Sequence, residues 1–109
     1  MSNTPQESET EKITEMLAPV FKKNKTVKAV LFGSHSRHTQ TGKSDLDLMI
    51  IIDTDKRFFD RYEQFNVIHD IISDRPVDML IFTPKELTAI SHRPLIKRIL
   101  AEGKTIYES

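Results

Sequence analysis

The spacing of the apolar residues changes several times along the chain, and each change predicts a new element of secondary structure. The first apolar residues recur three and four positions apart, which is the spacing of a helix that buries one face. They are Ile13, Met16, Leu17, Val20 and Phe21. Pro19 lies inside this pattern and should kink or shorten the helix, because proline lacks the N–H that a helix interior uses. Residues 1–10 precede the pattern, and we expect them to form a disordered tail.

Three apolar runs in the middle of the chain predict strands of a sheet. Residues 26–32 form the first run, which stops at Gly33, and residues 46–52 form the second. From Leu48 to Ile52 every residue is apolar, which is typical of a central strand covered on both faces. Residues 77–82 form the third run. Between the first two strands, a short helix from Ser34 and a polar turn at 39–43 are expected.

The rest of the chain predicts helices. Residues 57–72 have one apolar side and are predicted to form a single helix; the side consists of Phe58, Tyr62, Phe65, Ile68 and Ile72. Thr83 and Glu86 have the spacing of a capping box, so a further helix should run from Pro84 to about Ile90. A last helix around residues 95–100 should stop at Gly103, and residues 105–107 form a short strand or an extended tail. The expected order is α-β-β-α-β-α-α.

Length and composition indicate one globular domain, which we place at residues 11–109. The chain has 109 residues, of which 38% are hydrophobic and 29% charged, and no cysteine. A disulfide and a thiolate metal site are therefore excluded. No apolar run reaches the length of about 18 residues that predicts a membrane span, and the first ten residues lack the features of a signal peptide. We expect a cytoplasmic protein.

The charges are unevenly distributed although the formal net charge is zero. Residues 12–43 carry seven bases and one acid, whereas residues 44–78 carry nine acids and four bases. A basic segment ahead of an acidic one suits a site that holds phosphate beside a metal ion. The alternative is that the lysines at 22, 23, 25 and 28 form a solvated surface. Nothing in the pattern points to a broad nucleic-acid surface.

The candidate chemistry is concentrated between Phe32 and Met49. Gly33 and Ser34 form a turn, and Asp45 and Asp47 follow it on alternate positions of an apolar run. Residues i and i+2 of a strand project from the same face, roughly 6.5–7 Å apart. Two carboxylates that close favour a divalent cation between them, and Mg²⁺ sites commonly use one or two carboxylates plus substrate phosphates. A Gly-Ser turn lets backbone N–H groups approach such a phosphate.

Asp78 is a possible third carboxylate of the same site. It lies near the start of the apolar strand 77–82. If that strand is next to the strand of Asp45 and Asp47, the three carboxylates could hold two metal ions. One ion would then activate an attacking hydroxyl, and the other would steady the triphosphate and the leaving pyrophosphate. The alternative is that Asp78 is a solvent-exposed residue at a strand end.

Taken together, these motifs resemble the minimal nucleotidyltransferases (MNT) of the DNA polymerase β superfamily. That signature has a Gly-Ser turn with an arginine three residues beyond the serine, then Ser-Asp-hydrophobic-Asp-hydrophobic, then one aspartate on a later strand. Here it reads Gly33-Ser34-x-x-Arg37, Ser44-Asp45-Leu46-Asp47-Leu48 and Val77-Asp78. The resemblance covers the chain from about residue 12, and it implies an α/β (α+β) fold: a mixed β-sheet with helices packed mainly on one face.

The resemblance also implies residue roles and cofactors. The donor is ATP or another NTP, and two Mg²⁺ ions assist the transfer. The nucleotide-binding residues are Gly33, Ser34, Arg37 and Ser44, and the catalytic metal ligands are Asp45, Asp47 and Asp78. The family usually has a small residue before the arginine and a glycine after it, whereas this chain has Ser36 and His38.

The implied function is transfer of a nucleoside monophosphate, AMP by expectation, from an NTP to a hydroxyl. Family members of this size are often encoded with a small helical HEPN protein as the antitoxin of a toxin–antitoxin pair, and the acceptor is then a tyrosine of that partner. Two alternatives stay open. One is transfer to a small molecule of the aminoglycoside type. The other is a binding module that neutralises its partner by contact and has only a weak nucleotide site.

Overall fold

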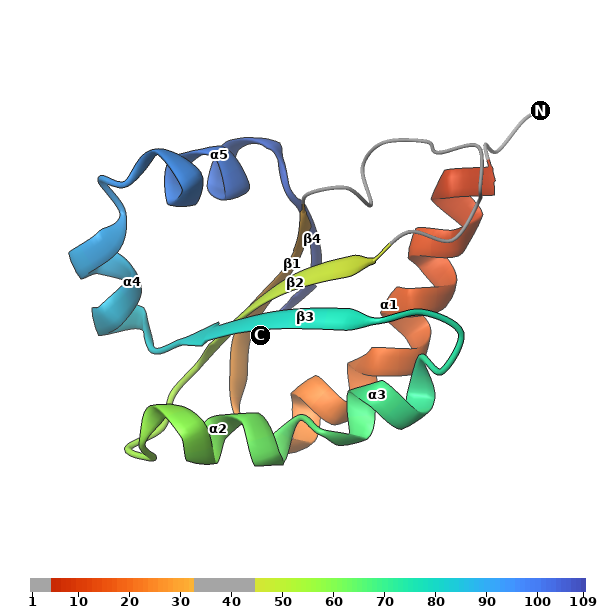
Figure 1. Ribbon diagram of the computed structural model, residues 1–109, viewed down its shortest axis with the longest axis horizontal. Helices are drawn as coiled ribbons and strands as arrows, with labels where there is room; N and C mark the ends of the chain where they lie inside the picture. The colour runs from red at the N-terminus through yellow and green to blue at the C-terminus, as the bar shows by residue number, and fades with distance from the viewer. Residues whose placement is uncertain (1–4, 33–44) are drawn as a thin grey trace.

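The computed structural model describes residues 5–32 and 45–109, and the described residues form one mixed sheet with helices around it (Figure 1). In chain order the elements are α1 (Pro5–Lys23), β1 (Thr26–Phe32), β2 (Leu46–Ile52), α2 (Phe58–Gln64), α3 (Val67–Ile71), β3 (Val77–Phe82), α4 (Pro84–Ile90), α5 (Pro94–Glu102) and β4 (Lys104–Glu108). The helix and turn expected at 34–43 lie outside the described residues.

The described strands pair in the order β3-β2-β1-β4. Strand β1 is antiparallel to both β2 and β4, whereas β2 and β3 are parallel, so the sheet is mixed. The five residues from Leu48 to Ile52 expose at most 5% of their surface, which confirms the prediction of a central strand covered on both faces. The segment around 105–107 forms strand β4.

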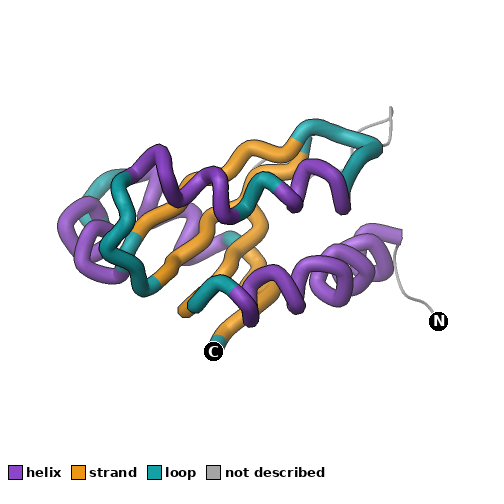
Figure 2. The backbone as a smooth tube through the Cα atoms, turned by 90° about the horizontal axis from the view of Figure 1, so that it is seen from below, coloured by secondary structure: helices purple, strands orange, loops and turns teal. Residues whose placement is uncertain are grey.

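Helices pack on both faces of the sheet, with the larger core on one of them. Helices α1, α2 and α3 cover the face that buries Leu17, Phe21, Leu48 and Phe65 in the larger core. Helices α4 and α5 lie on the other side and cover a smaller core that includes Ile99. The helices flank the strands in both views (Figures 1 and 2). The mixed α+β architecture agrees with the sequence expectation.

The segment 57–72 contains two helices, so the prediction of a single helix was wrong. A turn at Phe65 and Asn66 separates α2 from α3, where Phe65 N donates to Tyr62 O at 3.1 Å and Asn66 N donates to Glu63 O at 3.3 Å. These bonds span three residues instead of four and tighten the chain. The core residues on either side of the turn stay three and four positions apart, so the apolar spacing gives no sign of the break.

Helix α1 is longer than the sequence indicated. It begins at Pro5 and continues through Pro19 to Lys23, so residues 5–10 are helical where we expected a disordered tail. Thr10 is buried, and Glu9 pairs with Arg75 in the connector before β3. These contacts with distant parts of the fold stabilise helical turns that have no apolar periodicity of their own.

The ends of α4 and α5 follow the predicted local signals. Thr83 and Glu86 form the full capping box: Glu86 N donates to Thr83 Oγ1, and Thr83 N donates to Glu86 Oε1. Helix α5 stops at Gly103, which lies directly against β1. A Cβ at this position would come within 2.5 Å of Ile99 O and 3.0 Å of Leu31 O, so only glycine fits without a shift. In the part of the chain that the structure describes, no helix is long and apolar enough to cross a membrane.

Candidate active site

Asp47 and Asp78 lie directly opposite each other on two neighbouring strands. The parallel register of β2 and β3 pairs Asp47 with Asp78, and the antiparallel register of β1 and β2 pairs Asp47 with Phe32. Neighbouring strands are about 4.8 Å apart, so the two carboxylates project from adjacent backbone positions. The prediction that Asp78 lies on a strand adjacent to Asp47 is confirmed.

Both carboxylates project from the face that carries α4 and α5. Along β2 the residues at alternate positions from Asp47 are Met49 and Ile51, and along β3 those from Asp78 are Leu80 and Phe82. All four belong to the smaller core under α4 and α5. Asp78 is exposed and Asp47 is half-buried. The face is therefore apolar where these helices cover it and acidic where it reaches solvent.

Asp45 and Phe32 mark the ends of the segment that carries the other predicted residues. Asp45 is exposed, immediately precedes β2, and has the same strand parity as Asp47. Phe32, the last residue of β1, is paired with Asp47. Gly33, Ser34, Arg37 and Ser44 lie between these points, outside the described residues. The chain thus leaves β1 and enters β2 at the carboxylates.

The donor set at this end of the sheet fits a hard divalent cation. Asp45, Asp47 and Asp78 offer carboxylate oxygens only, and the exposure of Asp45 and Asp78 leaves room for water or phosphate oxygens. Over residues 5–32 and 45–109, no three Asp, Glu, His or Cys side chains come close enough to enclose a metal ion by themselves. Mg²⁺ does not need such an enclosure, because it retains several waters and is commonly held by one or two carboxylates plus substrate phosphates.

Arg75 supports the site from the opposite face, a role that the sequence did not reveal. Its side chain is only 4% exposed, its Nη2 pairs with Glu9 Oε2, and its Nε lies 3.7 Å from Asp74 Oδ1. Pro76, the next residue, holds the start of β3 beside β2, because its carbonyl oxygen accepts from Leu46 N at 2.9 Å. Arg75 therefore ties α1 to the connector that delivers Asp78. Its partner Glu9 is 66 positions away, so no local pattern could have identified the pair.

The chain matches a nucleotidyltransferase family model and one named relative. Residues 11–109 match the model described as polymerase beta, nucleotidyltransferase. A Methanocaldococcus jannaschii protein, provisionally named as a protein adenylyltransferase, is 33% identical over 89 residues. This match covers 75% of the chain and 58% of the relative, so the chain spans little more than half of that protein.

Solved structures share the fold at low sequence identity. One is the MNT antitoxin complex with a tri-AMPylated HEPN toxin of Shewanella oneidensis, with a TM-score of 0.60 and 15% identity over 92% of this chain and 73% of the other. Another is a toxin–antitoxin structure with AMP-PNP, with a TM-score of 0.58 and 18% identity over 88% and 73%. The family match over residues 11–109 includes every strand of the sheet and the aspartates at its acidic end. The chain belongs to the polymerase β nucleotidyltransferase family.

Proposed function

We propose that this domain transfers AMP from Mg²⁺-bound ATP to a hydroxyl group of a HEPN-type protein partner. The observation that carries the proposal is the register of Asp47 and Asp78 on the solvent-exposed end of the α4–α5 face. Two carboxylates in that register repel each other, and a bound cation removes the repulsion. Phe32, which is paired with Asp47, is the last residue before the predicted phosphate turn, Gly33-Ser34.

The proposed reaction forms one bond and breaks one. The acceptor oxygen bonds to the α-phosphorus of ATP, the bond from that phosphorus to the α–β bridging oxygen breaks, and pyrophosphate leaves. Asp78 would take the proton of the acceptor hydroxyl, and Asp45 and Asp47 would hold the cation. The metal supplies charge neutralisation at the phosphate oxygens. Gly33, Ser34, Arg37 and Ser44 would bind and orient the triphosphate.

The choice of a protein acceptor is supported by the relatives. The M. jannaschii relative carries the name of a protein adenylyltransferase, and the S. oneidensis antitoxin is seen with a toxin that is AMPylated. One toxin–antitoxin structure that shares this fold contains the nucleotide analogue AMP-PNP. Because the chain spans 58% of the M. jannaschii protein, the acceptor is a proposal for this chain.

Labelled ATP tests the proposal. The protein is incubated with Mg²⁺ and either α-³²P-ATP or γ-³²P-ATP, and with a HEPN-type protein from the same genome or an aminoglycoside as the acceptor. We expect label on the HEPN-type protein from the α-labelled donor only, because the γ-phosphate leaves in pyrophosphate. Label on the aminoglycoside alone would replace the protein acceptor by a small molecule. Neutralisation of the partner without any label would favour binding by contact.

A further inference from the structure

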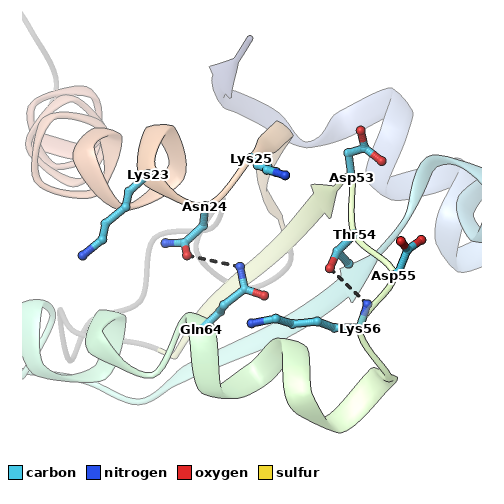
Figure 3. A pocket seen from close by; sticks show the side chains of 8 residues that line it. All are labelled: Lys23, Asn24, Lys25, Asp53, Thr54, Asp55, Lys56 and Gln64. Atoms are coloured by element: carbon cyan, nitrogen blue, oxygen red, sulfur yellow. Dashed lines mark hydrogen bonds between the residues drawn. The ribbon is translucent and has the colours of Figure 1, made fainter.

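A polar hollow lies at the end of β2 that is remote from the predicted active site (Figure 3). Its volume is about 460 Å³, within the range of roughly 300–1,000 Å³ that is typical of small-molecule sites. Three segments build it: the end of α1 with the turn that follows, the exit of β2, and α2. The lining residues are Lys23, Asn24, Lys25, Asp53, Thr54, Asp55, Lys56 and Gln64.

Hydrogen bonds hold the walls of the hollow together. Gln64 Nε2 donates to Asn24 Oδ1 at 3.1 Å, and Asn24 Nδ2 donates to Val20 O at 2.8 Å, which joins α2 to the end of α1. Asp53 N donates to Lys25 O at 3.2 Å, which joins the exit of β2 to the same turn. The backbone and the amide groups are therefore held in place before any ligand binds, which lowers the entropy lost on binding.

The charged side chains that line the hollow do not form ion pairs with one another. None of its three lysines and two aspartates forms an ion pair within the described part of the chain. Lys56 extends toward Gln64, whereas the carboxylates of Asp53 and Asp55 point away from Gln64 (Figure 3). The side of the hollow at Gln64 is thus lined by ammonium and amide groups, which suits an anion.

Two residues at the hollow, Gln64 and Lys25, each carry an energetic cost. Gln64 Oε1 is buried and has no hydrogen-bond partner in the described structure, and an unsatisfied buried acceptor costs roughly 1–3 kcal/mol. Lys25 has φ 55, a left-handed conformation that costs a non-glycine residue roughly 1–2 kcal/mol. Glycine would adopt this conformation without that cost, but it would remove one of the ammonium groups.

We propose that this hollow binds a small phosphate ester that also carries a hydroxyl or amino group. The lysine ammonium groups, including those of Lys25 and Lys56, bind the phosphate oxygens, for which compact cations are well suited. The hydroxyl or amino group of the ligand binds the amide groups that line the same side of the hollow, those of Asn24 and Gln64. The site lies at the opposite end of β2 from Asp47, so it is separate from the proposed nucleotide site.

Residue-resolved NMR titration without ATP and Mg²⁺ tests the proposal, with glucose 6-phosphate as the probe. We expect shifts at the backbone amides of Lys25 and residues 53–56 and at the side-chain amide of Gln64. Inorganic phosphate should bind several-fold more weakly, because it lacks the ring hydroxyls, and glucose should cause no shift. Equal effects of glucose 6-phosphate and inorganic phosphate would overturn the ester, and no shift at these residues would overturn the site.

Two variants and a control separate binding from folding. Lys25→Gly removes an ammonium group and relieves the backbone strain, so it should melt at the same or a higher temperature. Lys56→Gln keeps the side-chain length. Each variant should weaken glucose 6-phosphate binding by roughly five- to tenfold, the loss of one charge-assisted contact. Lys85→Gln, on exposed α4, should bind as the wild type does. Unchanged binding in both pocket variants would contradict the proposal.

Discussion

Carboxylates near the two ends of β2 have different neighbours. At its start, Asp47 meets Asp78 across the parallel ladder, so two negative charges lie side by side. Beyond its far end, Glu86 meets the guanidinium of Arg61. The second arrangement joins opposite charges, whereas the first sets like charges side by side, an arrangement that suits a divalent cation. The Arg61–Glu86 pair therefore serves the fold, and the acidic pair is suited to a ligand cation.

The Arg61–Glu86 pair shows what a structural charge pair looks like in this fold. Arg61 Nη1 and Nη2 donate to the two carboxylate oxygens of Glu86 at 2.6 and 2.9 Å, a bidentate geometry. Arg61 Nε also donates to Lys56 O at 3.0 Å, and Nη1 reaches Ile81 O at 3.5 Å. The pair therefore joins α2, the exit of β2, the end of β3 and the start of α4.

The same helix closes part of the open edge of β3. In a parallel ladder the carbonyls of alternate residues point away from the neighbouring strand. On β3 the carbonyl oxygens of Met79 and Ile81 accept from Tyr62 Oη, at 3.0 Å, and from Arg61 Nη1. An edge with occupied carbonyls is a poor template for pairing with another chain.

The largest expected effect is on catalysis, and it comes from removing one charge of the acidic pair. Asp47→Asn should lower AMP transfer by at least about 100-fold, because catalysis of this type relies on metal-assisted charge neutralisation. Without Mg²⁺ the variant should melt at the same or a slightly higher temperature, since the repulsion from Asp78 is gone. Labelling from α-³²P-ATP and a thermal melt measure the two effects. Undiminished labelling would place the chemistry elsewhere.

The next effect is on stability, and it breaks the structural pair. Arg61→Met should lower the free energy of unfolding by roughly 2–4 kcal/mol, because it leaves Glu86 without its counter-charge and two backbone carbonyls without a donor. Urea unfolding measures this. Arg98→Met, which replaces an exposed arginine of α5, is the control and should change stability by less than about 0.5 kcal/mol. Equal losses in the two variants would show that the Arg61–Glu86 pair is not special.

The stability that the structural pair provides should depend on pH. Hydrogen bonds from Arg61 and from the backbone of Thr83 lower the pKa of Glu86 from about 4.5 to about 2. A carboxyl whose pKa is lowered by folding contributes stability above its unfolded pKa, and this contribution is lost as the pH falls through its folded pKa. The stability difference between wild type and Glu86→Gln should therefore shrink between about pH 5 and pH 2. A difference that stays constant over this range would contradict the assignment.

The smallest expected effect concerns the acidic pair in the absence of metal. Asp78→Asn removes one of two like charges on adjacent strands, so it should raise the free energy of unfolding by roughly 0.5 kcal/mol at low ionic strength. The gain should fade in high salt, because Asp78 is exposed and its charge is screened. Asp70→Asn, in the exposed part of α3, provides the baseline. A destabilised Asp78→Asn would mean that this carboxylate has a structural role.

The sequence predicts the elements well where the signal is local. The three apolar runs have the same bounds as β1, β2 and β3, and the capping box marks the start of α4. The sequence pattern does not predict the ends of helices where tertiary contacts determine them. The apolar spacing stays in phase across the turn at Phe65, and the early turns of α1 depend on the distant partner of Glu9.

Part of the candidate site can likewise be predicted from local sequence, and part depends on the tertiary fold. Strand parity alone puts Asp45 and Asp47 on one face, since the side-chain period of a strand is two residues. The pairing of Asp47 with Asp78 depends on strand order and register, which no local pattern encodes. The role of Arg75, which is buried behind the site, follows only from the folded chain.

The central claim is that the acidic end of β2 binds a nucleotide through a divalent cation. Calorimetric titration of ATP, with and without Mg²⁺, tests it most directly in the wild type, Asp47→Asn and the control Asp70→Asn. We predict binding that requires Mg²⁺, is weakened at least about tenfold in Asp47→Asn, and is unchanged in Asp70→Asn. Equal ATP affinity with and without Mg²⁺, or equal affinity in Asp47→Asn and the wild type, would contradict the claim.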